Sequence, residues 1–220
     1  MAKKTNQTPE EENLENVVQE ENAGQEANGG ETVVQESEQT AEETVDNGIS
    51  IQVSQVKDGE SKVAETLDEG WEADGVAIVE GGQTLLVVAL NESQLPFGGD
   101  ESQNLEEDVA SPSMSGLDGQ QRSAFLIEFY GREEKQVPAL AACAEYGWLP
   151  SGGEMALIFA NKSAINDALE ALGGTVLGDG RYWTSQRFSN DRMWSCDMSN
   201  GTFGIALGTA SLAGVRAVKK

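Results

Sequence analysis

Residues 147–220 read GWLPSGGEMALIFANKSAINDALEALGGTVLGDGRYWTSQRFSNDRMWSCDMSNGTFGIALGTASLAGVRAVKK, and this stretch decides the fold. Ser151 and Glu154 form an S-x-x-E capping box, which marks the start of a helix because each side chain satisfies a backbone N–H of the first turn. Apolar residues recur at helical spacing from Met155 to Phe159 and again from Ile165 to Leu172. The stretch therefore predicts two short helices whose apolar faces cover a sheet.

Strand patterns follow these helices. Apolar and polar residues alternate from Met193 to Met198 and again from Phe203 to Leu207. Asn200 followed by Gly201 is the strongest short hairpin signal in the chain, and a final strand is predicted from Leu212 to Val218. Helices and strands in this order predict an α+β domain with a mixed sheet that helices cover on one side.

A hairpin is predicted upstream of this stretch. Two strand-like runs, Gly75–Glu80 and Gln83–Leu90, are joined by Gly81 and Gly82, which allow the positive φ angles of a tight turn. The second run is apolar on both faces from Leu85 to Leu90, as in a central strand that is covered on both sides.

A long polar loop is predicted between this hairpin and the helices. Residues 91–121 are rich in Pro, Gly, Ser and acids. The acids match no calcium-loop spacing, so a solvated loop is favoured over a cation site. These acids are Asp100, Glu101, Glu106, Glu107 and Asp108.

A third short helix is predicted between Pro138, at a first-turn position, and Gly147, as the C-cap.

The N-terminal third has a different composition. Residues 1–48 contain 13 acidic residues and two lysines, and every aromatic residue of the chain lies at or after Trp71. A segment with so little to bury stays solvated. The composition predicts a disordered acidic tail over residues 1–68 and a folded domain over residues 69–220, so removal of the tail is expected to leave the domain folded.

The charge balance excludes several partners. The net charge is −24, and no cluster of Lys and Arg exists that could bind phosphates, so neither nucleic acid nor an anionic membrane is expected as a partner. The N-terminus has no apolar run typical of a signal peptide, and the longest apolar run, Thr84–Leu90, is too short to span a bilayer. We expect the protein in the cytoplasm or in a virus particle, without membrane insertion.

The chain offers few residues for catalysis or metal binding. It has no histidine and two cysteines, Cys143 and Cys196, for which buried free thiols are favoured over a disulfide. Zinc sites need about four Cys or His ligands, and nucleophilic triads need a histidine base. No catalytic residue, metal ligand or cofactor is therefore expected.

The motifs WLPS, ANKSAIN, YWTS and SNG within residues 71–220 resemble the bacterial domains grouped as Lcl C-terminal or Fibrobacter major-paralogous domains. The resemblance implies a C-type-lectin-like fold of the kind found in gut Bacteroidales and their phages. In some relatives this segment is diversified by retroelements, which vary exposed positions and keep a conserved frame. The frame implied here is Trp148, Leu149, Tyr182, Trp183, Trp194, Gly201 and Val215. The display positions implied for ligand binding are Gln186, Arg187, Ser189, Asn190, Asp191, Arg192, Ser195, Asp197 and Thr202.

Two departures from relatives of this fold narrow the expected function. The Glu-Pro-Asn, Gln-Pro-Asp and Trp-Asn-Asp triplets that hold calcium in sugar-binding lectins are absent from the sequence. Formylglycine-generating enzymes need two reactive cysteines near the C-terminus, and Cys196 has no near neighbour of that kind, which makes a catalyst of that type the least favoured alternative.

Two functions remain open at this stage. The first is a non-enzymatic module, such as a phage or prophage virion protein, that displays a surface to a protein or glycan ligand. The second is a structural or decoration protein of a virion or larger assembly with no separate ligand. In either case the acidic tail could attach the domain to the assembly.

Overall fold

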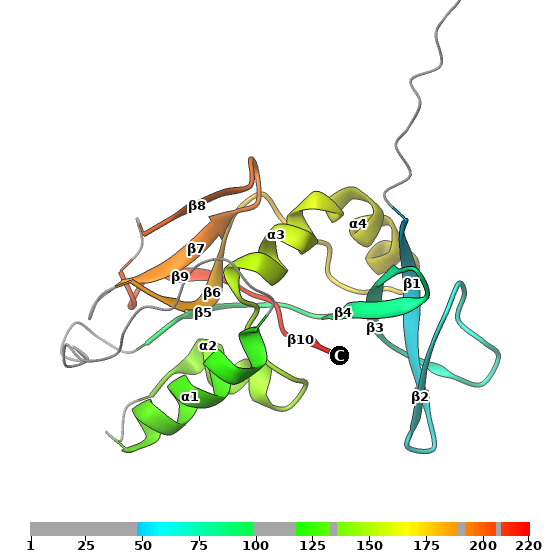
Figure 1. The fold of residues 1–220 in the computed structure, drawn as a ribbon, viewed down its shortest axis with the longest axis horizontal. Helices are drawn as coiled ribbons and strands as arrows, with labels where there is room; N and C mark the ends of the chain where they lie inside the picture. The colour runs from blue at the N-terminus through cyan, green and yellow to red at the C-terminus, as the bar shows by residue number, and fades with distance from the viewer. Residues whose placement is uncertain (1–47, 99–117, 133–135, 189–191, 206–207) are drawn as a thin grey trace, which may run out of the picture. The chain divides into compact units, whose positions relative to one another are not determined.

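The computed structural model describes residues 48–98, 118–132, 136–188, 192–205 and 208–220. The chain divides into two units, residues 1–44 and 45–220, and all described residues belong to the second. This unit is an α+β domain (Figure 1). Its described helices are α1 (Gly119–Arg132), α2 (Pro138–Ala144), α3 (Gly152–Ala160) and α4 (Lys162–Ala171).

The described strands form two five-stranded sheets instead of the single sheet that the sequence predicted. The first sheet has the order β10-β4-β3-β1-β2 and the second has the order β5-β9-β6-β7-β8. The first contains β1 (Ile49–Lys57), β2 (Glu60–Ala64), β3 (Glu72–Glu80), β4 (Gln83–Ala89) and β10 (Val218–Lys219). The second contains β5 (Ser93–Pro96), β6 (Arg181–Arg187), β7 (Met193–Asp197), β8 (Thr202–Gly204) and β9 (Leu212–Val215).

The domain begins well before residue 69, so the predicted domain boundary is wrong. β1 pairs antiparallel with β3 from Ile49 to Val56, and β2 pairs with β1. Ile49, Ile51 and Val53 alternate along β1, and the first two pack against the apolar cluster beneath α4. Composition missed this strand because its apolar residues are aliphatic and its other positions are polar. The predicted tail over residues 1–47 lies outside the described residues.

The hairpin of β3 and β4 confirms the prediction from sequence. Glu80 pairs with Gln83, and both intervening glycines, Gly81 and Gly82, have positive φ. β4 lies between β3 and β10. Leu86 belongs to the cluster on one face of the sheet and Val87 to the cluster on the other, as expected of a central strand.

The second sheet lies between two apolar clusters, so helices do not cover one side alone. Tyr182 and Trp183 follow one another in β6 and therefore point to opposite faces. Tyr182 packs in the cluster that contains residues of α3 and α4, while Trp183 packs in the cluster that contains residues of α1 and α2. The sheet is mixed as predicted, because β6 pairs parallel with β9 and antiparallel with β7.

One C-terminal segment joins the two sheets, as Figure 1 shows in red. It pairs with β5 in the second sheet, where Val215 lies opposite Ser93, and then with β4 in the first, where Val218 lies opposite Val88. Arg216 lies at the crossing and is fully buried. Its guanidinium donates to the carbonyls of Ala89, Leu90 and Thr175 at 2.9, 3.0 and 2.6 Å and to Glu92 Oε2 at 2.8 Å.

The capping box is confirmed at the start of α3. Ser151 Oγ accepts a hydrogen bond from the Glu154 N–H at 3.2 Å, and Glu154 Oε2 accepts one from the Ser151 N–H at 2.7 Å. The carboxylate also accepts from Trp148 Nε1 at 3.2 Å, which ties the WLPS segment to the helix.

Two elements lie in or beside the stretch that was predicted to be loop. β5 lies within residues 91–121, and it precedes Phe97, which is fully buried. The helix α1 begins at Gly119, and Leu126 and Tyr130 bury one of its faces at i, i+4 spacing. The five acids between residues 100 and 108 lie outside the described residues. None of the described helices is both long and apolar enough to cross a membrane.

Candidate functional site

The structure separates the nine predicted display residues into different environments. Gln186, Arg187 and Ser195 are 0, 4 and 0% exposed, so the interpretation of these three as displayed residues is wrong. Arg192 and Asp197 are half-buried, and Thr202 is exposed. Ser189, Asn190 and Asp191 lie outside the described residues.

Hydrogen bonds join two of the three buried residues to neighbouring elements. Gln186 Oε1 accepts a hydrogen bond from the N–H of Gly152, the first residue of α3, at 2.8 Å. Ser195 Oγ donates to the carbonyl of Gly204 at 3.2 Å and so links β7 to β8. Burial lowers the pKa of the Arg187 guanidinium, an effect that the neighbouring Tyr130 opposes. The polar character of these residues suggested exposure, but Gln186 and Arg187 lie in β6, which apolar clusters cover on both faces, and Ser195 lies in the adjacent strand β7.

The turn between β7 and β8 is held by two side chains that bond to the backbone just after them. Asp197 Oδ1 accepts from the N–H and the hydroxyl of Ser199 at 3.1 and 2.5 Å, and Asn200 Oδ1 accepts from the N–H and hydroxyl of Thr202 at 2.9 and 2.7 Å. Gly201 has φ of 74°, and a Cβ there would lie 2.4 Å from the Phe159 ring. Only glycine fits this position, and the hairpin signal of Asn200 and Gly201 is confirmed, because β7 and β8 pair antiparallel on either side of this turn.

Asp197 gives a prediction for the pH dependence of this turn. The Ser199 hydrogen bonds are the main cause that lowers the pKa of Asp197 below its usual 3.8, and Arg181 adds a smaller effect. A lowered pKa means that the carboxylate supports the folded turn at neutral pH and loses that role as the pH falls through the lowered pKa. Carbon-13 NMR titration is expected to show a midpoint below 3.8 that rises in Ser199→Ala. An unchanged midpoint in that variant would contradict this assignment.

Two aromatic residues, Phe188 just after β6 and Trp194 near the start of β7, lie in contact. The rings of Phe188 and Trp194 meet edge to face with centroids 5.7 Å apart, and Phe188 is 48% exposed. The Phe188 N–H donates to the Arg192 carbonyl at 3.0 Å, and Arg192 Nη1 donates to the Ile205 carbonyl at 2.9 Å. We call Phe188, Arg192 and Trp194 the tip surface.

Sequence reasoning included only Arg192 of the tip surface among the display residues. Trp194 was placed in the frame, but it is half-buried and forms part of the tip. Phe188 was not considered, because ligand-binding positions were sought among polar residues. The position of an aromatic residue directly before a polar run is the sequence signal that could have indicated it. Side chains alternate along β7, so Asp197 lies on the face opposite Trp194, where it pairs across the strands with Thr202. The other six frame residues are buried or, for Gly201, tightly packed.

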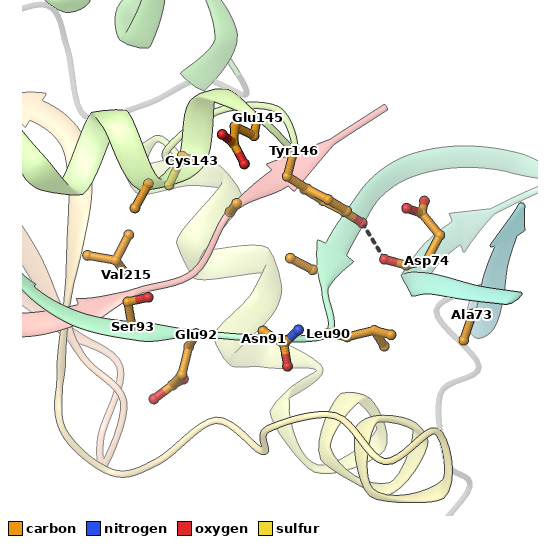
Figure 2. Close-up of a pocket in the computed structure, with 13 residues that line it drawn as sticks. Ala73, Asp74, Leu90, Asn91, Glu92, Ser93, Cys143, Glu145, Tyr146 and Val215 are labelled. Atoms are coloured by element: carbon orange, nitrogen blue, oxygen red, sulfur yellow. Dashed lines mark hydrogen bonds between the residues drawn. The ribbon is translucent and has the colours of Figure 1, made fainter. Parts of the chain in front are cut away.

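A separate cavity of about 480 Å³ lies where the two sheets meet α2 (Figure 2). Asn91, Glu92 and Ser93 form one wall, and Glu145 and Tyr146 at the end of α2 form another. The Tyr146 hydroxyl donates to the Asp74 carbonyl at 3.0 Å. Burial, and secondly the Asp74 charge, raise the pKa of Tyr146, so its hydroxyl remains protonated and keeps this bond. The cavity thus has polar walls that hydrogen bonds hold in place.

Two of the carboxylates around the cavity are already paired. Lys219 Nζ forms an ion pair with Asp74, and Arg216 Nη2 with Glu92. Tyr182 also donates its hydroxyl to Glu92 at 2.6 Å. Within the described ranges, no three Cys, Asp or Glu side chains come close enough together to hold a metal ion.

Both cysteines are free and buried, which confirms the preference for thiols over a disulfide. Burial raises the pKa of Cys143 to about 12 and that of Cys196 to about 11, so neither forms a thiolate at neutral pH. We expect no reaction with Ellman's reagent at pH 8 in the folded protein and two reactive thiols in 6 M guanidinium chloride. Rapid modification of either thiol in the folded protein would contradict this.

Comparisons with known proteins give little further information. No protein-family model and no curated protein matches the sequence. A fimbrial protein from Bacteroides ovatus is similar in structure at 16% sequence identity and a TM-score of 0.48. The match covers 60% of this chain and 35% of the fimbrial protein, so the chain spans about a third of that protein's length. A likeness at this level carries no argument about function.

Proposed function

We propose that the chain is a non-enzymatic binding module that recognises a protein or glycan ligand through the tip surface. The exposure of Phe188 against Trp194 is the observation that carries this proposal. Single exposed apolar residues are common, but two aromatic rings beside an arginine have the composition of binding hot spots. The pair offers apolar area for contact, and Arg192 adds a charged group.

The way the tip is attached supports this proposal. Trp194 lies within β7, which pairs with β6 on one side and β8 on the other. The carbonyl of Trp194 accepts from the Thr184 hydroxyl at 2.9 Å. A surface held in this way loses little conformational freedom when it binds, which favours affinity.

The finer proposals rest on the sequence resemblance. These are the C-type-lectin-like fold, a phage or prophage virion setting, a location in the cytoplasm or virion, and diversification of the segment by a retroelement. A degenerate copy of the coding sequence for residues 181–216 beside a reverse transcriptase gene would support diversification. Among the predicted display residues, Arg192 belongs to the proposed surface, while Asp197 and Thr202 would form a second contact on the opposite face.

A second candidate is a structural protein that packs into a larger assembly through α1. Phe125 is 49% exposed, and its ring stacks on Phe129 with centroids 6.1 Å apart. Ile127 on the same helix is also exposed. A position of the gene among capsid and tail genes would favour this function.

An array of proteins and glycans tests the binding proposal. We expect the full chain to bind at least one component and Phe188→Ala to lose that signal while its circular dichroism stays unchanged. Val176→Ala is the matched control, because Val176 is also apolar and 44% exposed but lies outside the tip. Binding that survives in Phe188→Ala would shift support to the α1 surface, where Phe125→Ala should then abolish it.

A further inference from the structure

The cavity between α2 and the two sheets has the dimensions of a small-ligand site. Its volume of about 480 Å³ falls within the range of about 300 to 1,000 Å³ that is usual for such sites. Several lining positions carry small side chains, which leave room for the hollow. The small residues are Ala73, Ala89, Ala142 and Ala217.

The polar groups around the cavity offer mainly acceptors. Glu92 receives its bonds from Tyr182 and Arg216 on Oε2, and Asp74 receives its bonds from Ser54 and Lys219 on Oδ2. The other carboxylate oxygens, Glu92 Oε1 and Asp74 Oδ1, accept no hydrogen bond within the described part of the chain. Two cations of the described residues lie near the cavity, and both are bound to these carboxylates: Arg216 to Glu92 and Lys219 to Asp74.

Glu145 is the one carboxylate of the lining without an ion pair among the described residues. It follows α2 as its C-cap residue, is exposed, and lies between Cys143 and Tyr146 on the cavity wall (Figure 2). The paired charges of Asp74 with Lys219 and Glu92 with Arg216 cancel. Among the described lining residues, the Glu145 carboxylate is therefore the one negative charge that no ion pair compensates, and it lies beside the small apolar side chains Ala142 and Ala217.

We infer that this cavity binds a primary ammonium group carried on a short alkyl chain. The ammonium would pair with the Glu145 carboxylate, because an ammonium has three donors and no acceptor. The alkyl chain would lie against Ala142, Val215 and Ala217. The negative charge of Glu145 would repel an anion, and a neutral alcohol could not form an ion pair with it. The same chemistry occurs in a free alkylamine and in the lysine side chain of a partner protein.

The test is an NMR titration of the nitrogen-15-labelled full chain in 150 mM NaCl with two probes. The first probe is n-butylammonium chloride, and the second is the peptide acetyl-Ala-Lys-Ala-amide. We expect saturable shifts at the amides of Asn91, Ser93, Glu145 and Tyr146, with a dissociation constant on the order of 1 mM. 1-Butanol has the same alkyl chain without the charge and is expected to give no saturable shift.

Variants separate a specific site from general attraction to an acidic chain. Glu145→Gln is expected to weaken binding by roughly tenfold, since a charge-assisted hydrogen bond becomes a neutral one. Glu170→Gln removes an exposed carboxylate of α4 that lies outside the cavity and is expected to leave binding unchanged. Equal loss in both variants, saturation by 1-butanol, or no saturation with either probe would overturn the inference.

The two probes identify the source of the ammonium group. Binding of butylammonium alone would assign the cavity to a free amine, and binding of the peptide would assign it to a lysine side chain. Phe188→Ala should bind both probes like the unmodified chain, because Phe188 is not part of the lining. The outcome is thus independent of the function proposed for the tip surface.

Discussion

Replacement of Arg216 by methionine is expected to lower the free energy of unfolding by about 3 to 5 kcal/mol, the range for removing one partner of a buried ion pair. Glu92 would lose its cation, and the carbonyls of Ala89, Leu90 and Thr175 would lose their donor at the crossing between the two sheets. Urea denaturation followed by tryptophan fluorescence measures this difference.

Two variants serve as controls for Arg216. Arg181→Met removes a more exposed arginine whose Nη2 lies 3.7 Å from Asp197 Oδ2, and such pairs contribute roughly 0 to 1 kcal/mol. Arg216→Lys should recover only part of the loss, because an ammonium cannot reproduce the planar fork of donors. If Arg216→Met and Arg181→Met are equally stable, Arg216 does not join the sheets as described.

Removal of residues 1–68 is expected to lower the melting temperature by about 10 °C or more, or to abolish cooperative unfolding. The deletion takes away β1 and β2, which leaves the backbone groups of β3 without partners along one edge. A loss of about 5 kcal/mol corresponds to roughly 10 to 20 °C in a domain of this size. Differential scanning calorimetry measures the shift.

A shorter deletion provides the matched control. Removal of residues 1–44 leaves the whole second unit, residues 45–220, and is expected to change the melting temperature by less than about 2 °C. Equal melting temperatures for the two deletions would show that β1 contributes nothing to the stability of the domain.

The parts of the fold that local signals specify were predictable from sequence. The capping box at Ser151 and Glu154 located α3, and the pairs Gly81–Gly82 and Asn200–Gly201 located two turns. Each signal works within a few residues, because capping and positive φ are local requirements. The α+β class followed from the order of these elements.

The elements that were missed depend on contacts between distant segments. β1 carries few large apolar residues, and its partner β3 begins at Glu72, well beyond the reach of a local turn. The burial of Gln186 depends on its contact with the first residue of α3, and that of Ser195 on its contact with β8, and no pattern within β6 or β7 reveals either. Phe188 was missed for a different reason, because exposed binding positions were sought among polar residues alone.

The most direct test of the proposed function is the dissociation constant of the ligand recovered from the array, measured for the full chain, Phe188→Ala and Val176→Ala. If the ligand binds to the tip surface, Phe188→Ala is expected to raise the dissociation constant at least about tenfold, a loss of about 1.4 kcal/mol in binding free energy. Val176→Ala is expected to change the dissociation constant by less than about twofold. Equal dissociation constants for all three proteins would contradict recognition through Phe188 and Trp194.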